Sequence, residues 1–298
     1  MDLEQIIRLY RITLKKSRII HRLFYAVGEN LMIPLFETLL RFRTPSGDPL
    51  NFRLKLLLNQ WEPETVVFFQ KVVQTGDSVL DIGAHVGYYT CLFAKLVGPS
   101  GKVVAVEPHP ENFRLLEKNT RRFQQVVRLN VAAGENEGEM ILYDTIHSAA
   151  ASLQLHESKR EMMVTKCAGE LNKRAASGFP VREYKVKVIP LDKVLFGETK
   201  FRIMKIDIEG AECIALKGMP HIMDELEIIV FELDRGNLET FGFSPGDLIN
   251  LIRNAGLNYF YILEAKSYIQ VSVSELEKIG NSLQLGHYIN VAATRFPL

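Results

Sequence analysis

One stretch of the sequence, residues 78–108, constrains the fold more than any other. It contains an apolar run that ends at Asp81, a turn with glycines at positions 83 and 87, and a second apolar run that ends at Glu107. The residues between the turn and the second run carry apolar side chains at three- and four-residue spacings, the period of a helix with one buried face. Strand, glycine turn, helix and strand in this order predict a βαβ unit of a nucleotide-binding sheet.

The charge of the glycine turn indicates which ligand this unit binds. A dinucleotide or triphosphate site places phosphate at the helix N-terminus, where a carboxylate would repel it. Here Asp81 opens the turn, with the spacing D-x-G-x-x-x-G. S-adenosylmethionine (SAM) has no phosphate and carries a sulfonium and an ammonium, so we predict SAM as the cofactor. Glu107 is placed to accept both ribose hydroxyls. The alternative is that the two acids only cap strand ends.

The composition is that of an ordinary globular protein. The chain has 298 residues, of which 47% are hydrophobic and 24% charged, enough for one large domain with an appendage. A net charge of +1 argues against a nucleic-acid partner. The cysteines lie far apart without metal-ligand spacing, which predicts a reducing, cytoplasmic location: Cys91, Cys167 and Cys213. We expect neither a secretory signal nor a spanning helix, because the richest apolar stretch, residues 31–40, is short and interrupted.

Residues 1–60 differ from the rest of the chain in charge. They carry ten Lys and Arg against five acids, and residues 8–22 hold six bases and no acid, interleaved with apolar side chains. Such an amphipathic segment can lie on an anionic membrane surface. One interpretation is therefore peripheral membrane contact through residues 8–22. The reading we favour is a helix that packs its apolar side on the main domain. We therefore predict a basic helical extension over residues 1–60.

Further elements continue the alternation of strands and helices. A helix is expected from Pro63, with Val66, Val67, Phe69 and Val73 buried, and another from Pro110. Residues 144–183 form a long polar connection, which we predict to be a helical lid or insert over the acceptor pocket. Strands are expected over residues 126–130, 140–143, 184–189, 203–206 and 228–231, with a final antiparallel edge pair over 259–263 and 287–294.

A second stretch, residues 201–218, also carries chemistry. A buried strand ends there, and Asp207, Glu209 and Glu212 follow it. Carboxylates at a strand end cost desolvation energy, so a fold gathers them where something polar or cationic binds. One alternative is a helix N-terminus that attracts acids through its dipole, which explains Glu212 better than Asp207. Another is a divalent metal on Asp207, Glu209 and Glu232. We predict no metal, because SAM itself can use these acids.

These motifs resemble the FkbM family of SAM-dependent methyltransferases. The resemblance covers about residues 60–298, and KIDIEGAE is its most diagnostic part, among DIGAHVG (81–87), VEPHPEN (106–112), KIDIEGAE (205–212) and YINVAA (288–293). The family usually has Asn in place of His85. The resemblance implies an α/β, Rossmann-like class I methyltransferase fold: a seven-stranded, mostly parallel sheet with helices on both faces, formed by residues 61–298. It also implies O-methylation of a hydroxyl on a sugar, glycan or natural-product small molecule.

The expected site residues come from four segments. Asp207 and Glu209 are predicted to face the methyl group and the acceptor, one of them as the base. His85, His109 and His147 are rival bases, because the unperturbed pKa of histidine suits neutral pH. The predicted cofactor-binding residues are Asp81, Gly83, Ala84, His85, Gly87, Tyr88, Glu107 and Pro108, with Asn130 and Ala132 beside the adenine.

Two other functions use the same cofactor residues. An N-methyltransferase acting on a protein or lipid amine differs only in its acceptor pocket. A scaffold protein that binds SAM without transferring the methyl group keeps the fold and lacks the activity. The family resemblance implies O-methylation, and the intact acidic positions argue against the scaffold.

Overall fold

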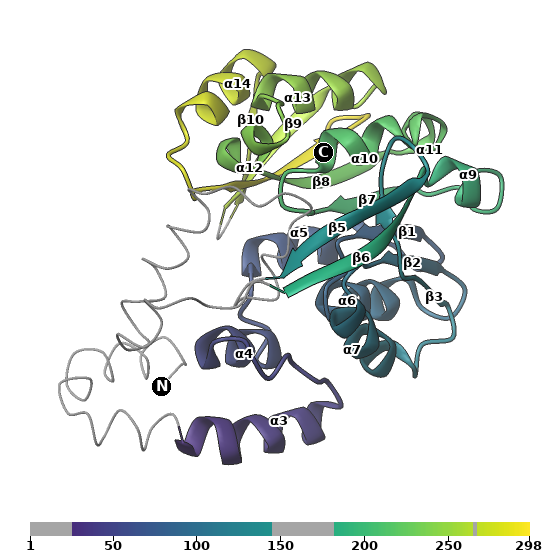
Figure 1. Cartoon of the computed structure of the whole chain (residues 1–298). Helices are drawn as coiled ribbons and strands as arrows, with labels where there is room; N and C mark the ends of the chain where they lie inside the picture. The colour runs from purple at the N-terminus through teal and green to yellow at the C-terminus, as the bar shows by residue number, and fades with distance from the viewer. Residues whose placement is uncertain (1–25, 145–181, 265–266) are drawn as a thin grey trace. The chain divides into compact units, whose positions relative to one another are not determined.

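The computed structural model of the chain describes residues 26–144, 182–264 and 267–298 (Figure 1). The basic segment 8–22, for which membrane contact was one prediction, lies outside the described residues. Most of the 144–183 connection, the predicted lid, also lies outside them. The chain divides into two compact units, Met1–Trp61 and Glu62–Leu298.

The first unit contains a short buried charge network. Arg53 pairs with Glu29 and, at 3.5 Å, with Glu37, whose Oε1 atom also accepts the hydroxyl of Thr44 at 2.7 Å. These charges are therefore neutralised within the unit. Its described helices are η2 (Gly28–Met32), α3 (Ile33–Leu40) and α4 (Leu50–Leu57). Across the residues that the structure describes, no helix is both long and apolar enough to cross a membrane.

The second unit folds around an eight-stranded sheet with the order β10-β9-β11-β8-β7-β1-β2-β3. Strands β3, β2, β1, β7 and β8 run parallel, whereas β11, β9 and β10 are antiparallel to their neighbours. The strands are β1 (Ser78–Ile82), β2 (Lys102–Val106), β3 (Val126–Leu129), β7 (Ile203–Ile206), β8 (Ile228–Leu233), β9 (Tyr259–Glu264), β10 (Ser267–Val271) and β11 (Ile289–Thr294).

The prediction of a mostly parallel α/β sheet is confirmed, but the expected count of seven strands is wrong. The last two predicted strands, β9 and β11, do pair antiparallel. They do not form the edge, because β10 pairs with β9 on its outer side. Strand β10 escaped prediction because its side chains are mostly exposed, so its sequence lacks the buried apolar run that identifies a strand.

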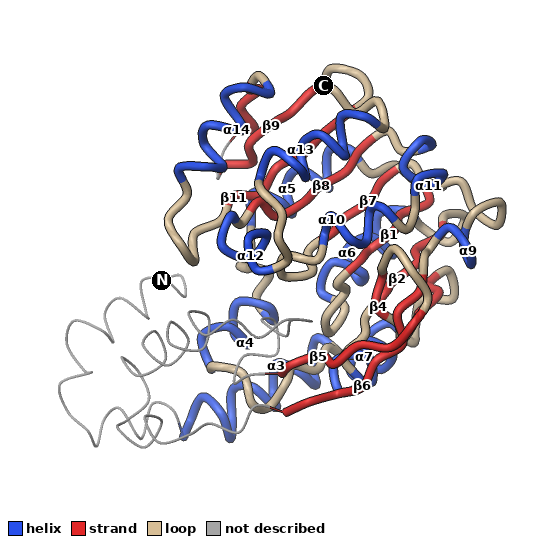
Figure 2. Tube along the Cα trace, turned by 45° about the horizontal axis from the view of Figure 1, so that its top comes forward, coloured by secondary structure: helices blue, strands red, loops and turns tan. Residues whose placement is uncertain are grey.

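Helices cover the sheet in two layers with the strands between them (Figures 1 and 2). The predicted helix from Pro63 is present, with Phe69 and Val73 buried as expected and Val66 half-buried. Thr65, Phe68 and Phe69 are buried, whereas Val67 is 44% exposed. The helices are α5 (Pro63–Val72), α6 (Tyr88–Val97), α7 (Pro110–Thr120), α9 (Asp192–Leu195), α10 (Glu212–Lys217), α11 (Pro220–Glu225), α12 (Arg235–Thr240), α13 (Pro245–Asn254) and α14 (Val273–Ser282).

A separate three-stranded sheet has the order β4-β6-β5. Its strands are β4 (Ala132–Ala133), β5 (Gly138–Asp144) and β6 (Arg182–Ile189), and Figure 2 shows β5 and β6 as a long ribbon. Strand β6 has the one wet face that its sequence predicts, with Val186 and Val188 buried and Lys185 exposed. This small sheet contributes Ala132 and Leu142 to the pocket described next.

Candidate active site

Strand register brings three turns to one place. Ile82 at the end of β1 is paired with Val106 of β2 and with Ile206 of β7. The chain therefore leaves all three strands at the same edge of the sheet, where ligands of parallel α/β sheets bind. A pocket that is partly open to solvent lies there, with about 600 Å³ of empty space when its open mouth is included. Its lining consists of Ile82, Gly83, His85, Val106, Glu107, Pro108, Asn112, Val131, Ala132, Ala133, Leu142, Asp207, Ile208, Glu209 and Ala211.

The turn after β1 can only be built with glycine at position 83. Gly83 has φ +81°, and a Cβ atom there would lie 1.9 Å from the carbonyl oxygen of Asp207. The β1 turn and the β7 turn are thus in direct backbone contact, and a side chain would force them apart. His85 also has positive φ, +51°. Asn and His both tolerate this conformation better than most residues, so His85 is compatible with the backbone of this turn.

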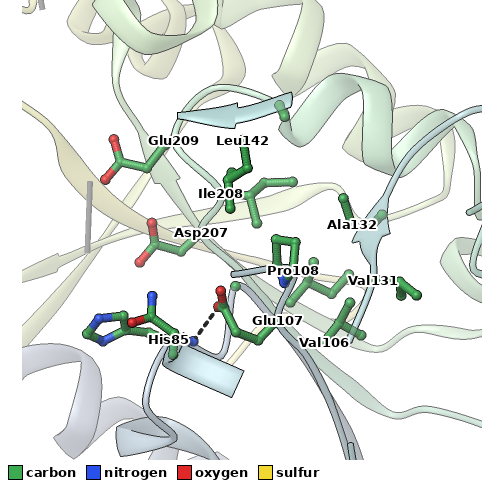
Figure 3. Close-up of a pocket in the computed structure, with 15 residues that line it drawn as sticks. His85, Val106, Glu107, Pro108, Val131, Ala132, Leu142, Asp207, Ile208 and Glu209 are labelled. Atoms are coloured by element: carbon green, nitrogen blue, oxygen red, sulfur yellow. Dashed lines mark hydrogen bonds between the residues drawn. The ribbon is translucent and has the colours of Figure 1, made fainter. Parts of the chain in front are cut away.

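Glu107 links the turns that follow β1 and β2. Its Oε2 atom accepts the backbone N–H of His85 at 2.8 Å (Figure 3). Its Oε1 atom accepts the backbone N–H of His109 at 2.8 Å. Burial raises the pKa of Glu107 to about 7, although both N–H donors act to lower it. Each carboxylate oxygen keeps a second lone pair. Glu107 can therefore still accept two hydroxyls, the arrangement that a ribose diol requires.

The rest of the pocket suits an adenine and not a pyrophosphate. Val131 and Ala132 lie on the side opposite Asp207 and Glu209 (Figure 3). None of the lining residues is Lys or Arg. A phosphate-bearing nucleotide would meet carboxylates without a compensating cation, whereas a cofactor with a sulfonium and an ammonium is attracted to them. The residues present therefore fit SAM.

The acids after β7 have different surroundings. Asp207 lines the pocket, and its Oδ2 atom lies 3.0 Å from Nζ of Lys205. Glu209 also lines the pocket, has φ +58°, and accepts the side-chain amide of Asn237 at 2.9 Å. Glu212 instead stabilises the loop: its Oε1 atom accepts the N–H groups of Ile208 at 2.9 Å and of the glycine at 210 at 3.3 Å. Glu212 therefore holds the loop that presents the other two acids.

Asp81 lies beneath the pocket and does not line it. The side chain is fully buried, and its Oδ2 atom accepts the hydroxyl of Thr90 at 2.6 Å. Among the described residues, no hydrogen-bond partner reaches its Oδ1 atom. Burial raises the pKa of Asp81 to about 6, while the charge of Lys205 and the Thr90 bond lower it. Direct contact between Asp81 and a ligand would need the turn to open.

Other predicted cofactor residues also support the pocket from outside its lining. Ala84 is buried against Leu116, and Gly87 begins helix α6 with φ +88°. Asn130 donates to the carbonyl oxygens of Glu107 at 2.8 Å and of Pro108 at 3.1 Å, which fixes the turn after β2. Tyr88, the first residue of α6, is half-buried and is not among the lining residues. The predicted residues that the pocket does bring together are Gly83, His85, Glu107, Pro108, Ala132, Asp207 and Glu209.

The rival histidine bases divide into three cases. His85 lines the pocket. His109 is 1% exposed, accepts the N–H of Asn112 through Nδ1 at 3.3 Å and packs on the ring of Tyr184, so it begins helix α7. His147 lies outside the described residues. Over the described parts of the chain, no three His, Cys, Asp or Glu side chains are grouped so as to hold a metal ion.

Sequence reasoning missed a second polar layer beside Asp207. Tyr89 donates its hydroxyl to Glu62 at 2.7 Å, and Lys205 lies 4.7 Å from the centre of the Tyr89 ring. Burial raises the pKa of Glu62, and the charge of Asp207 raises it further. Lys205 could have been noticed, because a lysine inside the apolar strand IMKI needs a buried acidic partner. Glu62 gave no such signal, since an acid before a proline also starts an ordinary helix.

The chain is similar to several known proteins. A family model described as the methyltransferase FkbM domain matches residues 81–259. A protein-L-isoaspartate O-methyltransferase from Caenorhabditis elegans is 37% identical over 92 residues, which cover 28% of this chain and 41% of that protein. The hexuronic acid methyltransferase AglP from Haloferax volcanii is 22% identical over 199 residues, which cover 66% of this chain and 70% of AglP. A SAM-dependent methyltransferase structure from Aquifex aeolicus has a TM-score of 0.40 and 14% identity, covering 89% of this chain and 98% of that one.

Proposed function

The chain belongs to the FkbM methyltransferase family, and from this we propose that it transfers a methyl group from SAM to a hydroxyl of a sugar, glycan or natural-product acceptor. One observation carries the proposal. The carboxylates that follow β2 and β7, Glu107 and Asp207, line a single pocket that has an apolar wall and no lining cation. In this proposal residues 61–298 form the methyltransferase domain and residues 1–60 an extension.

The pocket residues have distinct roles toward the cofactor. Glu107, which lines the pocket, would accept the ribose hydroxyls, and Val131 and Ala132 would pack against the adenine. Gly83 lets the turn after β1 lie directly against the carbonyl oxygen of Asp207. Asp81 and Asn130 act indirectly, by holding the turns from behind. Bound SAM supplies an electrophilic methyl group on a positively charged sulfur.

Asp207 and Glu209 act on the acceptor. A hydroxyl is a weak nucleophile, so a base that takes its proton in the transition state accelerates the reaction by roughly 10²–10⁴-fold. We assign this base to Asp207, whose carboxylate is fixed by Lys205. Glu209, held by Asn237, orients the acceptor. Both residues line the pocket, as this assignment requires.

The acids at the Asp207 end of the pocket bear on the class of acceptor. AglP, a relative at 22% identity, is a hexuronic acid methyltransferase, which supports a sugar acceptor. In this chain Asp207 and Glu209 both bring carboxyl groups to the pocket lining. A carboxylated sugar would be repelled by them, so we expect a neutral sugar to be the better acceptor. The same acids would attract an amine, which makes N-methylation of an amine the second candidate.

A labelling experiment tests this function. The full chain is incubated with methyl-labelled SAM and three acceptors: a methyl hexopyranoside, a methyl hexuronoside and a lysine-containing peptide. We expect label in the neutral sugar. Label only in the peptide would establish N-methylation instead. SAM binding by calorimetry without label in any hydroxyl-bearing compound of a metabolite extract would favour the scaffold function.

The Asp207→Asn variant tests the assigned base. Turnover should fall by roughly 10²–10⁴-fold, a larger effect than that on SAM affinity, because proton abstraction by the base is an interaction of the transition state. Asp192→Asn is a suitable control, since Asp192 bonds to His221 in another part of the unit. Wild-type turnover in Asp207→Asn would remove Asp207 from the role of base.

The cysteines support a cytoplasmic location for this enzyme. Cys91 and Cys213 are buried free thiols. Free thiols persist in reducing compartments, whereas oxidising compartments favour disulfides. The proposal is tested by fractionating cells that express the chain and locating it with an antibody.

A further inference from the structure

Lys205 occupies an unusual position for a lysine. It lies within β7 with 5% of its surface exposed, and its register partner on β1 is Asp81. Among the described residues it is the only buried lysine. A buried ammonium without partners costs several kcal/mol or loses its proton, so such a residue needs acids around it.

The ammonium of Lys205 contacts one carboxylate directly and is linked to a second through Tyr89. Nζ lies 3.0 Å from Oδ2 of Asp207 on one side. On the other side it lies over the ring of Tyr89, 4.7 Å from its centre, and the hydroxyl of Tyr89 donates to Glu62 at 2.7 Å. A continuous line of contacts therefore runs from the pocket, through Lys205 and α6, to the residue that precedes α5.

The charges around this line are mostly negative. Burial lowers the pKa of Lys205, but the charges of Asp207, Asp81 and Glu62 raise it above its ordinary value, so the ammonium stays protonated. In return, Lys205 lowers the pKa of both Glu62 and Asp81. The titratable groups that act on one another here come from every surrounding element: Glu62, Asp81, Tyr89, Lys205, Asp207, Glu209, Glu212, Glu232 and Tyr288.

We propose that Lys205 is the positioning residue of this site. Its ammonium holds the Asp207 carboxylate in place and supplies a positive charge among the neighbouring acids. This inference rests on the proposed function, because it gives Lys205 a role toward the acids that face the methyl group. Lys205 itself does not line the pocket and acts through Asp207 and Glu62.

The test compares a cationic and a neutral ligand, so it needs no acceptor. SAM carries a positive sulfur, and S-adenosylhomocysteine carries a neutral one. The ratio of their dissociation constants, measured by calorimetry from pH 5 to 9, reports the negative charge at this end of the pocket. The variants are Lys205→Met, which removes the charge, Lys205→Gln, which removes the charge but keeps a donor, and Lys205→Arg, which keeps the charge. Lys185→Met, an exposed lysine on β6, is the control.

In the wild type the preference for SAM should develop as the acids ionise. In Lys205→Met and Lys205→Gln the midpoint of this change should move to higher pH by about one unit or more, because a neighbouring opposite charge typically lowers a carboxyl pKa by about 1–3. Lys205→Arg and Lys185→Met should keep the wild-type midpoint. Lower thermal stability with an unchanged midpoint in the Met and Gln variants would show that Lys205 is only structural. Failure of the wild type to bind either ligand would instead overturn the proposed function.

Discussion

Glu107 accepts the backbone N–H of His85 at 2.8 Å, so the acid that follows β2 fastens the glycine turn that follows β1. The same carboxylate accepts the N–H of His109 at the start of α7. One side chain therefore organises two loops before any ligand is bound. Such preorganisation reduces the entropy lost on binding.

The first prediction concerns Glu107→Gln. The substitution removes the negative charge and one of the acceptor oxygens, so one ribose hydroxyl loses a charge-assisted hydrogen bond worth about 1.5–3 kcal/mol. We expect the Kd for SAM, measured by calorimetry, to rise by roughly 10–100-fold. Glu111→Gln is the matched control, because Glu111 is an exposed acid in the first turn of α7. Equal SAM affinities in the wild type and Glu107→Gln would remove Glu107 from the site.

The second prediction concerns the pH dependence of stability without ligand. Burial raises the pKa of Glu107 from 4.5 to about 7. Because the folded-state value is the higher one, the stability that this group contributes is complete below pH 4.5, declines as the pH rises through about 7, and is constant above. The loss amounts to about 3 kcal/mol. The Tm of Glu107→Gln relative to wild type should therefore increase from pH 5 to pH 8 in calorimetric scans. A Tm difference that does not change with pH would contradict a raised pKa.

The third prediction concerns the contact between the β1 and β7 turns. In Gly83→Ala the new methyl group would lie 1.9 Å from the Asp207 carbonyl oxygen, in a backbone with φ +81°. We expect the free energy of unfolding, from urea titration, to fall by about 3 kcal/mol or more, since both strain and displacement of the β7 turn contribute. Gly138→Ala is the control, because nothing lies within 4 Å of the added atom. A loss in Gly83→Ala no larger than in Gly138→Ala would show that the turns can separate freely.

The sequence predicted the elements whose signal is local. Strand β1 is an apolar run that ends within the glycine motif, and strand β2 is an apolar run that ends just before Glu107. The order of the two strands and the sheet edge that they share therefore follow from the sequence alone. Strand β10 could not be predicted, because its pairing with β9 and not its own composition makes it a strand. The lining of the pocket was predicted where residues directly follow strands, as with Asp207.

How deeply a side chain is buried was harder to predict than which strand it follows. Asp81 and Glu107 look equivalent in sequence, as acids at or just beyond the ends of neighbouring strands. The side chain of Asp81 belongs to the strand itself and is buried beneath the turn, whereas Glu107 follows the strand and lines the pocket. Glu62 was missed because only the tertiary fold brings it to Tyr89.

The last prediction concerns the bond between Thr90 and Asp81. Thr90 donates to Oδ2 of Asp81 at 2.6 Å, and both side chains are fully buried. Thr90→Val keeps the shape but leaves a buried carboxylate without this donor, which costs about 1–3 kcal/mol. Burial raises the pKa of Asp81 to about 6, so the cost applies at pH 8, where Asp81 is charged, and should be smaller at pH 5, where it is protonated. Urea titrations of the wild type and of Thr90→Val at the two pH values measure this difference in cost. In an Asp81→Asn background the effect of Thr90→Val should be smaller at pH 8, and an equal effect in both backgrounds would show that the hydroxyl acts on something other than the charge of Asp81.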